Sequence, residues 1–192
     1  MDLTFYITIA GKSTRMGADK AEQILGGKTF LERLTNTISD LGFTPFLITQ
    51  EDVKVKNNLP CIPDYTPQIG PLGGLYQSLR HAETAYIVYL SCDIPLLPAE
   101  VLKLLMKQAS SQACSMVCYK NKMYPLIGIY HKSILPVVSH QLKGKNYKMM
   151  DLIERVNARG VSVESWVNDE ILLNCNNVDD LEKLKDYYNN CL

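Results

Sequence analysis

The sequence predicts an α/β fold built around a mostly parallel, doubly wound sheet. In the first half of the chain, β-rich runs alternate with stretches whose apolar residues recur at helical spacing. Such alternation is typical of βαβ units, in which helices cover both faces of a parallel sheet. The length of 192 residues and the 46% content of hydrophobic residues fit one globular domain, so we expect a single domain over residues 1–192.

The elements of the first half are predicted from periodicity and from residues that end helices. A β-rich opening run predicts the first strand, and five apolar residues at helical spacing follow before Gly42 ends the helix. A third strand contains prolines and is expected at an edge of the sheet, because proline cannot donate to the hydrogen-bond ladder. The expected strands are 3–10, 45–49, 59–62 and 86–91, and the expected helices are 29–41 and 70–82.

The second half opens with a helix at 98–106, whose leading proline suits the first turn of a helix. Two strands follow, and then two helical stretches with apolar residues at helical spacing. A late apolar run predicts a further strand that leads into the last helix. The expected strands are 115–119, 126–130 and 171–175, and the expected helices are 133–142, 149–156 and 178–188.

Composition and charge exclude several classes of protein. The chain has 20 basic and 20 acidic residues, which argues against binding nucleic acid through bulk charge. No apolar run approaches the roughly 20 residues that span a bilayer, so no membrane association is expected. Six dispersed cysteines without a C-x-x-C pair, and no secretory signal at the start, predict a cytoplasmic protein.

Two polar loops follow predicted strands, and both are candidate ligand sites. Ligands of doubly wound sheets bind beyond the carboxyl ends of the strands. Asp93 follows the most apolar strand, and a rigidly held carboxylate there suits Mg²⁺, which prefers hard oxygen ligands. The alternative role of Asp93 is a helix N-cap, but it stands five residues before Pro98 and is too early for that position.

The loop after the first strand spans residues 10–20 and reads AGKSTRMGADK. A P-loop would need a glycine five residues before the Gly-Lys pair, and that position is Tyr6. Backbone amides around Gly11 can instead approach an anion closely. Arg15 and Lys20 would neutralise the charge of a nucleotide triphosphate and of the departing pyrophosphate. The alternative is a solvated basic loop that binds nothing.

This loop resembles the L-A-G-G-x-S-x-R-M-G-x-D-K signature of the molybdenum cofactor guanylyltransferase (MobA) family of nucleotidyltransferases. Further similar segments occur in the same order along the chain. Asp64 and the run GPLGGL at 70–75 resemble the D…G-P-L-x-G-L of the family, and CDIP at 92–95 resembles its C-D-x-P. The segments YPL at 124–126 and NCNNVDDL at 174–181 resemble H-P-L and N-V-N-T-P-E-D-L.

The resemblance implies a three-layer Rossmann-like nucleotidyltransferase fold and a Mg²⁺-dependent reaction. The implied enzyme transfers GMP from GTP to molybdopterin or the molybdenum cofactor and releases pyrophosphate. Other proteins of cofactor biosynthesis and acceptor molybdoenzymes are further implied partners. A phosphate monoester is already anionic, so the reaction needs no strong general base, and the protein mainly positions two anions.

Site residues follow from the matched positions. The implied nucleotide contacts are Ile9, Ala10, Gly11, Lys20, Thr49, Asp64 and Asp93, and the implied catalytic residues are Arg15, Lys20 and Asp93. Asp93 is the implied magnesium ligand. Gly70 and Gly74 would let the backbone approach a bulky pterin, or would serve helix–sheet packing. Asn174 and Asn176 lie two apart on the predicted late strand, so their side chains would face the second substrate together, or would stand at a strand-to-helix corner.

Three departures from the family pattern keep other functions open. One glycine follows Ala10 where the family has two, Thr49 stands where the guanylyltransferase carries Asn, and Tyr124 replaces the His of H-P-L. Thr49 leaves open a cytidylyltransferase for the same pterin, or a transferase for another small phosphate. The missing glycine leaves open a nucleotide-binding domain without catalysis. A third alternative is a P-loop GTPase, which would hydrolyse the γ-phosphate of the nucleotide instead of transferring its α-phosphate.

Overall fold

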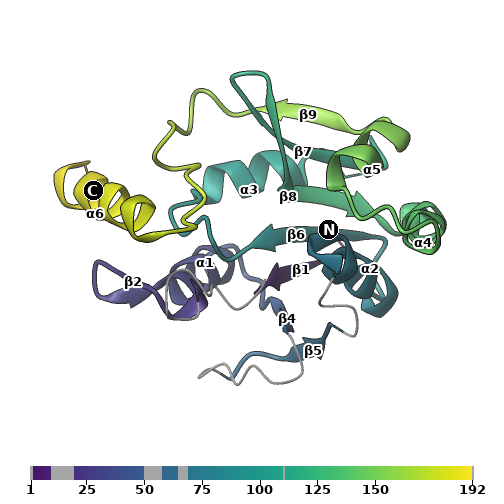
Figure 1. Cartoon of the computed structure of the whole chain (residues 1–192), viewed down its shortest axis with the longest axis horizontal. Helices are drawn as coiled ribbons and strands as arrows, with labels where there is room; N and C mark the ends of the chain where they lie inside the picture. The colour runs from purple at the N-terminus through teal and green to yellow at the C-terminus, as the bar shows by residue number, and fades with distance from the viewer. Residues whose placement is uncertain (1, 10–19, 50–57, 65–68, 110, 192) are drawn as a thin grey trace.

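A seven-stranded sheet organises the chain, with strand order β5-β4-β1-β6-β8-β7-β9 (Figure 1). The computed structural model describes residues 2–9, 20–49, 58–64, 69–109 and 111–191. The neighbouring pairs β5–β4, β4–β1, β1–β6 and β7–β9 are parallel. Strand β8 is antiparallel to both of its neighbours, β6 and β7. The predicted mostly parallel sheet is therefore confirmed. Its strands are β1 (Leu3–Thr8), β4 (Phe46–Thr49), β5 (Cys61–Pro63), β6 (Tyr86–Ser91), β7 (Cys114–Tyr119), β8 (Lys122–His131) and β9 (Arg159–Ser162).

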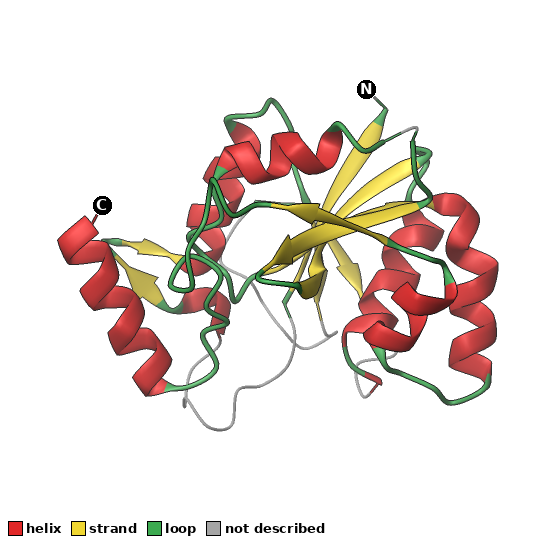
Figure 2. Cartoon of the chain, turned by 90° about the horizontal axis from the view of Figure 1, so that it is seen from above, coloured by secondary structure: helices red, strands yellow, loops and turns green. Residues whose placement is uncertain are grey.

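Helices cover both faces of the sheet, which gives three layers (Figure 2). Side chains alternate along β1, so Phe5 and Ile7 join one core with α1 and α3, while Tyr6 joins the other with α2, α4 and α5. No helix in the described part of the chain is long and apolar enough to cross a bilayer. The helices are α1 (Phe30–Ser39), α2 (Pro71–His81), α3 (Ala99–Met106), α4 (Leu135–Lys143), α5 (Met149–Arg155) and α6 (Val178–Cys191), with 3₁₀ turns η1 (Lys20–Glu22) and η3 (Lys132–Ile134).

Helix α1 begins at a reciprocal cap that the sequence encodes locally. The Thr29 hydroxyl accepts a hydrogen bond from the Glu32 amide at 3.1 Å, and the Glu32 carboxylate accepts one from the Thr29 amide at 2.6 Å. This capping box satisfies two amides at the start of the helix. The helix predicted at 29–41 is thus confirmed, and the hydrogen bonds of the cap fix the residue at which it begins.

Three strands of the described residues, β2, β3 and β9, were not predicted. Strands β2 (Ile24–Leu25) and β3 (Lys28–Thr29) form an antiparallel hairpin across Gly26 and Gly27, which both have positive φ. Such a glycine pair is a known signal for a two-residue hairpin turn. Strand β9 pairs in parallel with β7 although it is mostly exposed, and a Cβ at its Gly160 would lie 3.0 Å from both Cys118 and Met123. Exposed strands that contain glycine carry little β signal in their sequence.

The strand predicted at 171–175 is wrong, because these residues form turns and irregular backbone. The position beside β7 is taken by β9. Leu172 and Cys175 are nevertheless buried, in two different hydrophobic clusters. A short apolar run predicts burial well, but it cannot by itself distinguish a strand from another buried segment.

Helix α6 and the β2–β3 hairpin form a small separate cluster beside the main layers, as Figure 1 shows at its left. Its buried members are Leu25, Phe30, Cys175, Leu181 and Leu184. Arg33 of α1 ties the cluster together, because its guanidinium donates to the Leu25 carbonyl (2.7 Å from Nε) and lies 4.4 Å over the Tyr188 ring.

Candidate functional site

The carboxyl ends of β1, β4 and β6 meet at one edge of the sheet. The last pair of the β1–β6 ladder is Thr8 with Ser91, and the Cys92 amide extends it by donating to the Thr8 carbonyl at 3.2 Å. On the other side, the Ile9 amide donates to the Ile48 carbonyl at 3.0 Å. The strand order therefore brings the ends of three parallel strands together, where ligands of doubly wound sheets bind.

Asp93 lies directly beyond β6 at this edge. Its side chain is half-buried, with Oδ1 shielded from solvent. Its backbone carbonyl accepts a hydrogen bond from the Cys175 amide at 3.0 Å. The loop that carries the carboxylate is thus held from two sides, by the β1–β6 ladder and by the segment before α6.

Asp64 lies beyond β5, on the other side of β1. Its amide donates to the Thr49 carbonyl at 2.6 Å, so the end of β4 positions it. Thr49 itself is buried, with 5% of its surface exposed. Burial raises the pKa of Tyr89 on β6, a hydrogen bond from Thr8 lowers it, and the negative charge of Asp64 raises it further. The charge of the Asp64 carboxylate therefore influences the Tyr89 phenol, which belongs to the neighbouring part of the sheet.

Helix α2 presents its N-terminus at this edge without a side-chain cap. Gly70 has φ 72°, a conformation that suits glycine, and a Cβ there would meet nothing within 4 Å. Gly74 differs, because it is buried and its Cβ would lie 2.5 Å from the Tyr89 hydroxyl. Of the two roles proposed for these glycines, the structure places Gly74 in helix–sheet packing and leaves Gly70 at the open end of the helix.

Asn174 and Asn176 are brought to Asp93, although not by a strand. Because residues 171–175 are irregular, the prediction that both side chains share a strand face is wrong. Both asparagines are exposed, and they flank Cys175, the buried residue that bonds to Asp93. The Asn176 side chain donates to the Asn174 carbonyl at 3.1 Å. The turn itself, rather than strand pleating, therefore positions the pair.

Part of the predicted site lies outside the described residues. Ala10, Gly11 and Arg15 fall there, whereas Ile9 is described and is buried at the end of β1. Lys20 begins η1 through its backbone. The assignments of Ala10, Gly11, Arg15 and Lys20 stay predictions from the sequence.

Tyr89 on β6 makes a polar contact near this edge that its sequence did not predict. The phenol donates to the Pro71 carbonyl at 2.9 Å. A tyrosine in an apolar strand gives no signal of such contacts, because the partners come from elements that are distant in sequence.

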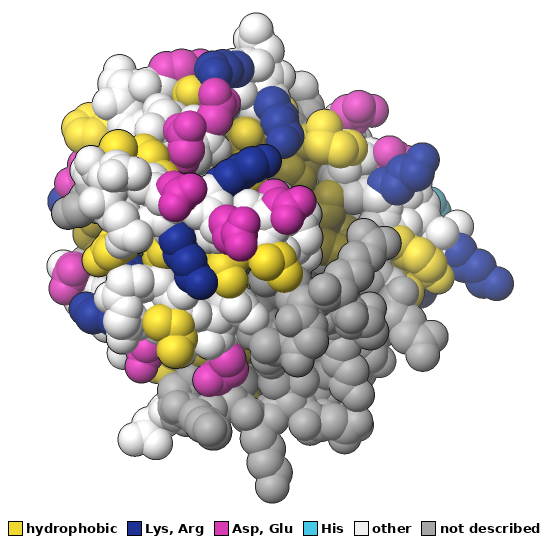
Figure 3. All heavy atoms as spheres, turned by 60° about the vertical axis from the view of Figure 1, so that its left-hand side comes forward, with side chains coloured by type: hydrophobic (Ala, Val, Ile, Leu, Met, Phe, Trp, Pro, Cys, Tyr) yellow, Lys and Arg dark blue, Asp and Glu magenta, His cyan; other side chains and the backbone are white. Residues whose placement is uncertain are grey.

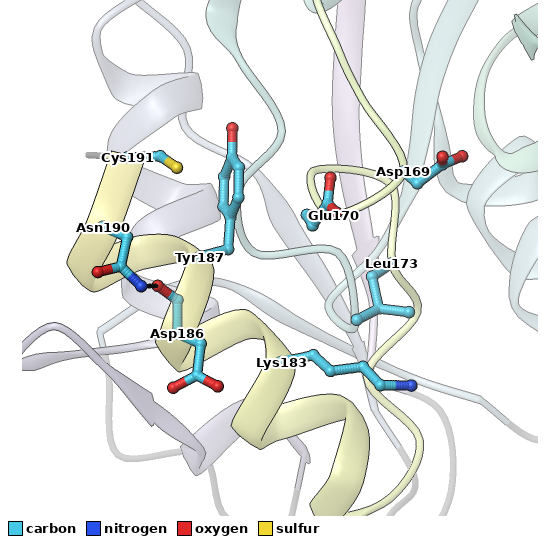
Figure 4. Close-up of a pocket in the computed structure, with 8 residues that line it drawn as sticks. All are labelled: Asp169, Glu170, Leu173, Lys183, Asp186, Tyr187, Asn190 and Cys191. Carbon is cyan, nitrogen blue, oxygen red and sulfur yellow. Dashed lines mark hydrogen bonds between the residues drawn. The ribbon is translucent and has the colours of Figure 1, made fainter.

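A pocket of about 420 Å³ lies between α6 and the turn that precedes Asn174 (Figure 4). Its described lining includes the carboxylates of Asp169, Glu170 and Asp186 and the ammonium group of Lys183. An excess of carboxylates disfavours a polyanionic ligand. On the face that Figure 3 shows, acidic and basic side chains of described residues are interspersed. We therefore place the candidate nucleotide site at the strand ends and not in this pocket.

The mostly parallel sheet with helices on both faces defines a three-layer Rossmann-like architecture. The sequence profile of the MobA-like NTP transferase domain matches residues 6–160, and the chain belongs to that family. Relatives named probable molybdenum cofactor guanylyltransferase occur in Carboxydothermus hydrogenoformans, at 36% identity over 95% of each chain, and in Flavobacterium johnsoniae, at 37% identity over 95% of this chain and 96% of the relative.

Solved structures show the same fold. The molybdopterin-guanine dinucleotide biosynthesis protein A of Archaeoglobus fulgidus has a TM-score of 0.80 at 23% identity, over 95% of this chain and 97% of that one. The 2-C-methyl-D-erythritol 4-phosphate cytidylyltransferase of Thermus thermophilus has a TM-score of 0.72 at 12% identity, over 98% of this chain and 100% of that one. These likenesses confirm the three-layer fold predicted from the sequence.

Proposed function

We propose that this protein transfers GMP from GTP to molybdopterin or the molybdenum cofactor and releases pyrophosphate. The observation that carries the proposal is the position of Asp93 at the meeting point of three parallel strands, held there by the segment that bears Asn174 and Asn176. Family membership and the names of relatives at 36% and 37% identity support it. Cytoplasmic location, and contact with other cofactor-biosynthesis proteins or acceptor molybdoenzymes, stay predictions.

The donor set at the strand ends fits a magnesium ion bound together with substrate. Within the described residues, no three His, Cys, Asp or Glu side chains gather as a closed metal site. Asp93 instead offers one hard carboxylate, and Mg²⁺ in proteins is usually held by one or two carboxylates together with phosphates and waters. When bound, the ion would neutralise charge on the phosphates. We propose Asp93 as its protein ligand.

The proposed roles of the chain are mainly binding and alignment. The uncapped amides of α2 and the positive end of that helix favour an anionic group at the strand ends. Arg15 and Lys20 are proposed to reduce the repulsion between the two substrates and to stabilise the charge that develops on pyrophosphate. Ile9, Ala10, Gly11, Thr49 and Asp64 are proposed to contact the nucleotide, and Gly70, Asn174 and Asn176 to line the second-substrate site.

Thr49 supports a second candidate, a cytidylyltransferase for the same pterin. This residue stands where the guanylyltransferase carries Asn, and its side chain is buried at the end of β4. A hydroxyl offers a different set of hydrogen bonds from an amide. Base preference is decided by comparing GTP, CTP and ATP in separate reactions and in competition.

The test is incubation with Mg²⁺, molybdopterin and each nucleotide, with pyrophosphate release and product mass as readouts. We expect GTP to give the dinucleotide product, and Asp93→Asn to lower the rate by at least about 100-fold. Asp186→Asn is the matched control, because this exposed carboxylate lines the pocket at α6. A wild-type protein that binds GTP but releases no pyrophosphate with any nucleotide contradicts the proposal and favours a non-catalytic nucleotide-binding domain.

A further inference from the structure

The Tyr89 hydroxyl lies at the junction of three elements, although the side chain belongs to the core. Tyr89 is fully buried, and its ring packs edge-on against Tyr130 with centroids 6.5 Å apart. A phenylalanine would serve that packing equally well. The hydroxyl donates a hydrogen bond to the Pro71 carbonyl at 2.9 Å, and the Thr8 hydroxyl lies near it, since both oxygens face Gly74. Because buried polar groups are costly when unpaired, the bond to Pro71 specifies where α2 begins relative to β6.

Gly74 shows how closely α2 approaches this hydroxyl. A Cβ at Gly74 would lie 2.5 Å from the Tyr89 oxygen and 3.3 Å from both Thr8 Oγ1 and Ile48 Cγ2. The first of these distances is shorter than any acceptable contact, so α2 can occupy its position only with glycine there. The Tyr89 hydroxyl therefore occupies the space that a side chain at position 74 would need. Together, the hydroxyl and the glycine set the distance between α2 and the sheet.

The partners of Tyr89 come from the segments that surround the proposed nucleotide. Thr8 ends β1 directly before Ile9, Pro71 lies in the first turn of α2, and the charge of Asp64 acts on the phenol. A change at the hydroxyl is thus transmitted to the end of β1 and to the start of α2 at the same time. Because the hydroxyl donates to the Pro71 carbonyl, its proposed effect on substrate passes through the start of α2.

We propose that Tyr89 is a positioning residue that fixes the start of α2 against the end of β1 and so sets the affinity for the nucleotide. This inference rests on the proposed function for its substrate. It assigns Gly74 to the same device, as the residue that makes room for the hydroxyl. Removing the hydroxyl shifts the start of α2 relative to the end of β1, where the nucleotide is proposed to bind. The proposed catalytic residues stay in place, so we expect KM for GTP to change and kcat to stay the same.

The first test compares Tyr89→Phe with Tyr86→Phe, a matched change on the same strand. The Tyr86 hydroxyl lies at the opposite end of β6, 3.4 Å from the Gln112 carbonyl. We expect Tyr89→Phe to raise KM for GTP about three- to tenfold with kcat within about twofold of wild type. Tyr86→Phe should change neither constant. A lower melting temperature with unchanged KM for GTP would reduce Tyr89 to a purely structural role and overturn the proposal.

The second test is a double-mutant cycle with Gly74→Ala. The added methyl group collides with the hydroxyl, so this variant should bind GTP more weakly than wild type in calorimetry without the acceptor. Combining it with Tyr89→Phe removes the collision, and the double variant should bind GTP more tightly than Gly74→Ala alone. Additive effects would overturn the proposal. Should Tyr89→Phe be too unstable to assay, Thr8→Val removes the neighbouring hydroxyl that faces Gly74, and it must also weaken GTP binding for the proposal to stand.

The two proposals fail in different ways. If wild-type protein binds GTP but no nucleotide yields pyrophosphate, the transfer reaction is refuted, while the Tyr89–Gly74 coupling is still decided by calorimetry. If transfer proceeds and the double-mutant cycle is additive, the proposed function stands and the positioning role of Tyr89 falls. Wild-type protein that neither binds GTP nor releases pyrophosphate from it refutes both.

Discussion

At the scale of single residues, the proposed chemistry depends on placing two anions side by side. Asp93 is held from two sides by backbone hydrogen bonds, to which the Cys175 amide contributes one at 3.0 Å. A carboxylate that is fixed before substrate arrives loses little conformational freedom on binding it, which is the basis of preorganisation. The proposed task of the basic loop is different, because we expect its charges to act on the substrates through space.

The prediction for that loop concerns Arg15 and Lys20. Changing either to alanine should lower kcat/KM by at least about tenfold, because each removes a positive charge that offsets repulsion between the substrates. The melting temperature should stay close to that of wild type. Lys107→Ala is the matched control, since this exposed lysine at the end of α3 lies outside the proposed site. An unaltered rate in both variants would remove these residues from the proposed site.

At the scale of elements, local signals decided which parts of the fold were predictable. Strand β6 was predicted at its observed bounds, because a strand that is buried on both faces is a continuous apolar run. The β2–β3 hairpin was missed although its glycine pair signals a turn, and β9 was missed because it is short and exposed. In 171–175, by contrast, the apolar run correctly indicated that Leu172 and Cys175 are buried, but it wrongly predicted a strand.

The capping box of α1 yields a prediction at this scale. Thr29→Ala should lower the free energy of unfolding by about 1 kcal/mol, because it removes the hydroxyl that caps the helix. Chemical denaturation measures this loss, and the slope of the unfolding free energy against denaturant concentration should stay unchanged. Thr37→Ala in the same helix is a comparison variant, because the Thr37 hydroxyl donates to the Arg33 carbonyl one turn earlier and does not cap the helix. An equal loss in both variants would argue against the cap.

The same cap makes stability depend on pH. Hydrogen bonds from Thr29 hold the pKa of Glu32 below its ordinary value. A carboxyl group with a lowered pKa in the folded state stabilises the fold above its unfolded pKa, and this contribution is lost as the pH falls through the folded pKa. We therefore expect the stability difference between wild type and Glu32→Gln to shrink below pH of about 4. A difference that stays constant from neutral to acidic pH would contradict this assignment.

At the scale of the whole molecule, the site is assembled from segments that are far apart in the sequence. Asp93, Asp64 and the Asn174–Asn176 turn lie at one edge of the sheet, because parallel strands deliver their carboxyl ends there and because the segment before α6 returns to that edge. The sequence motifs predicted that these segments form one site, and the roles of their residues stay predictions. They did not predict the bond from Cys175 to Asp93 or the contacts of Tyr89, since both depend on packing between distant elements.

This assembly predicts that the small cluster at α6 supports catalysis from a distance. Leu184 and Leu152 are both fully buried, the first in the cluster that contains Cys175 and the second in the core under α2 and α4. Changing either to alanine should cost about 2–5 kcal/mol of stability. Only Leu184→Ala should also lower pyrophosphate release at a temperature where both variants remain folded, because Cys175 anchors the Asp93 loop through its amide.

The comparison separates loss of stability from loss of support for Asp93. Circular dichroism gives the folded fraction of each variant, and rates are compared per folded molecule at saturating GTP and Mg²⁺. If Leu184→Ala loosens the Asp93 loop, raising the Mg²⁺ concentration should recover part of its rate, since a mobile carboxylate weakens metal binding without abolishing it. Equal rates per folded molecule in the two variants would show that the cluster at α6 contributes stability alone and that the Cys175 bond is dispensable for the reaction.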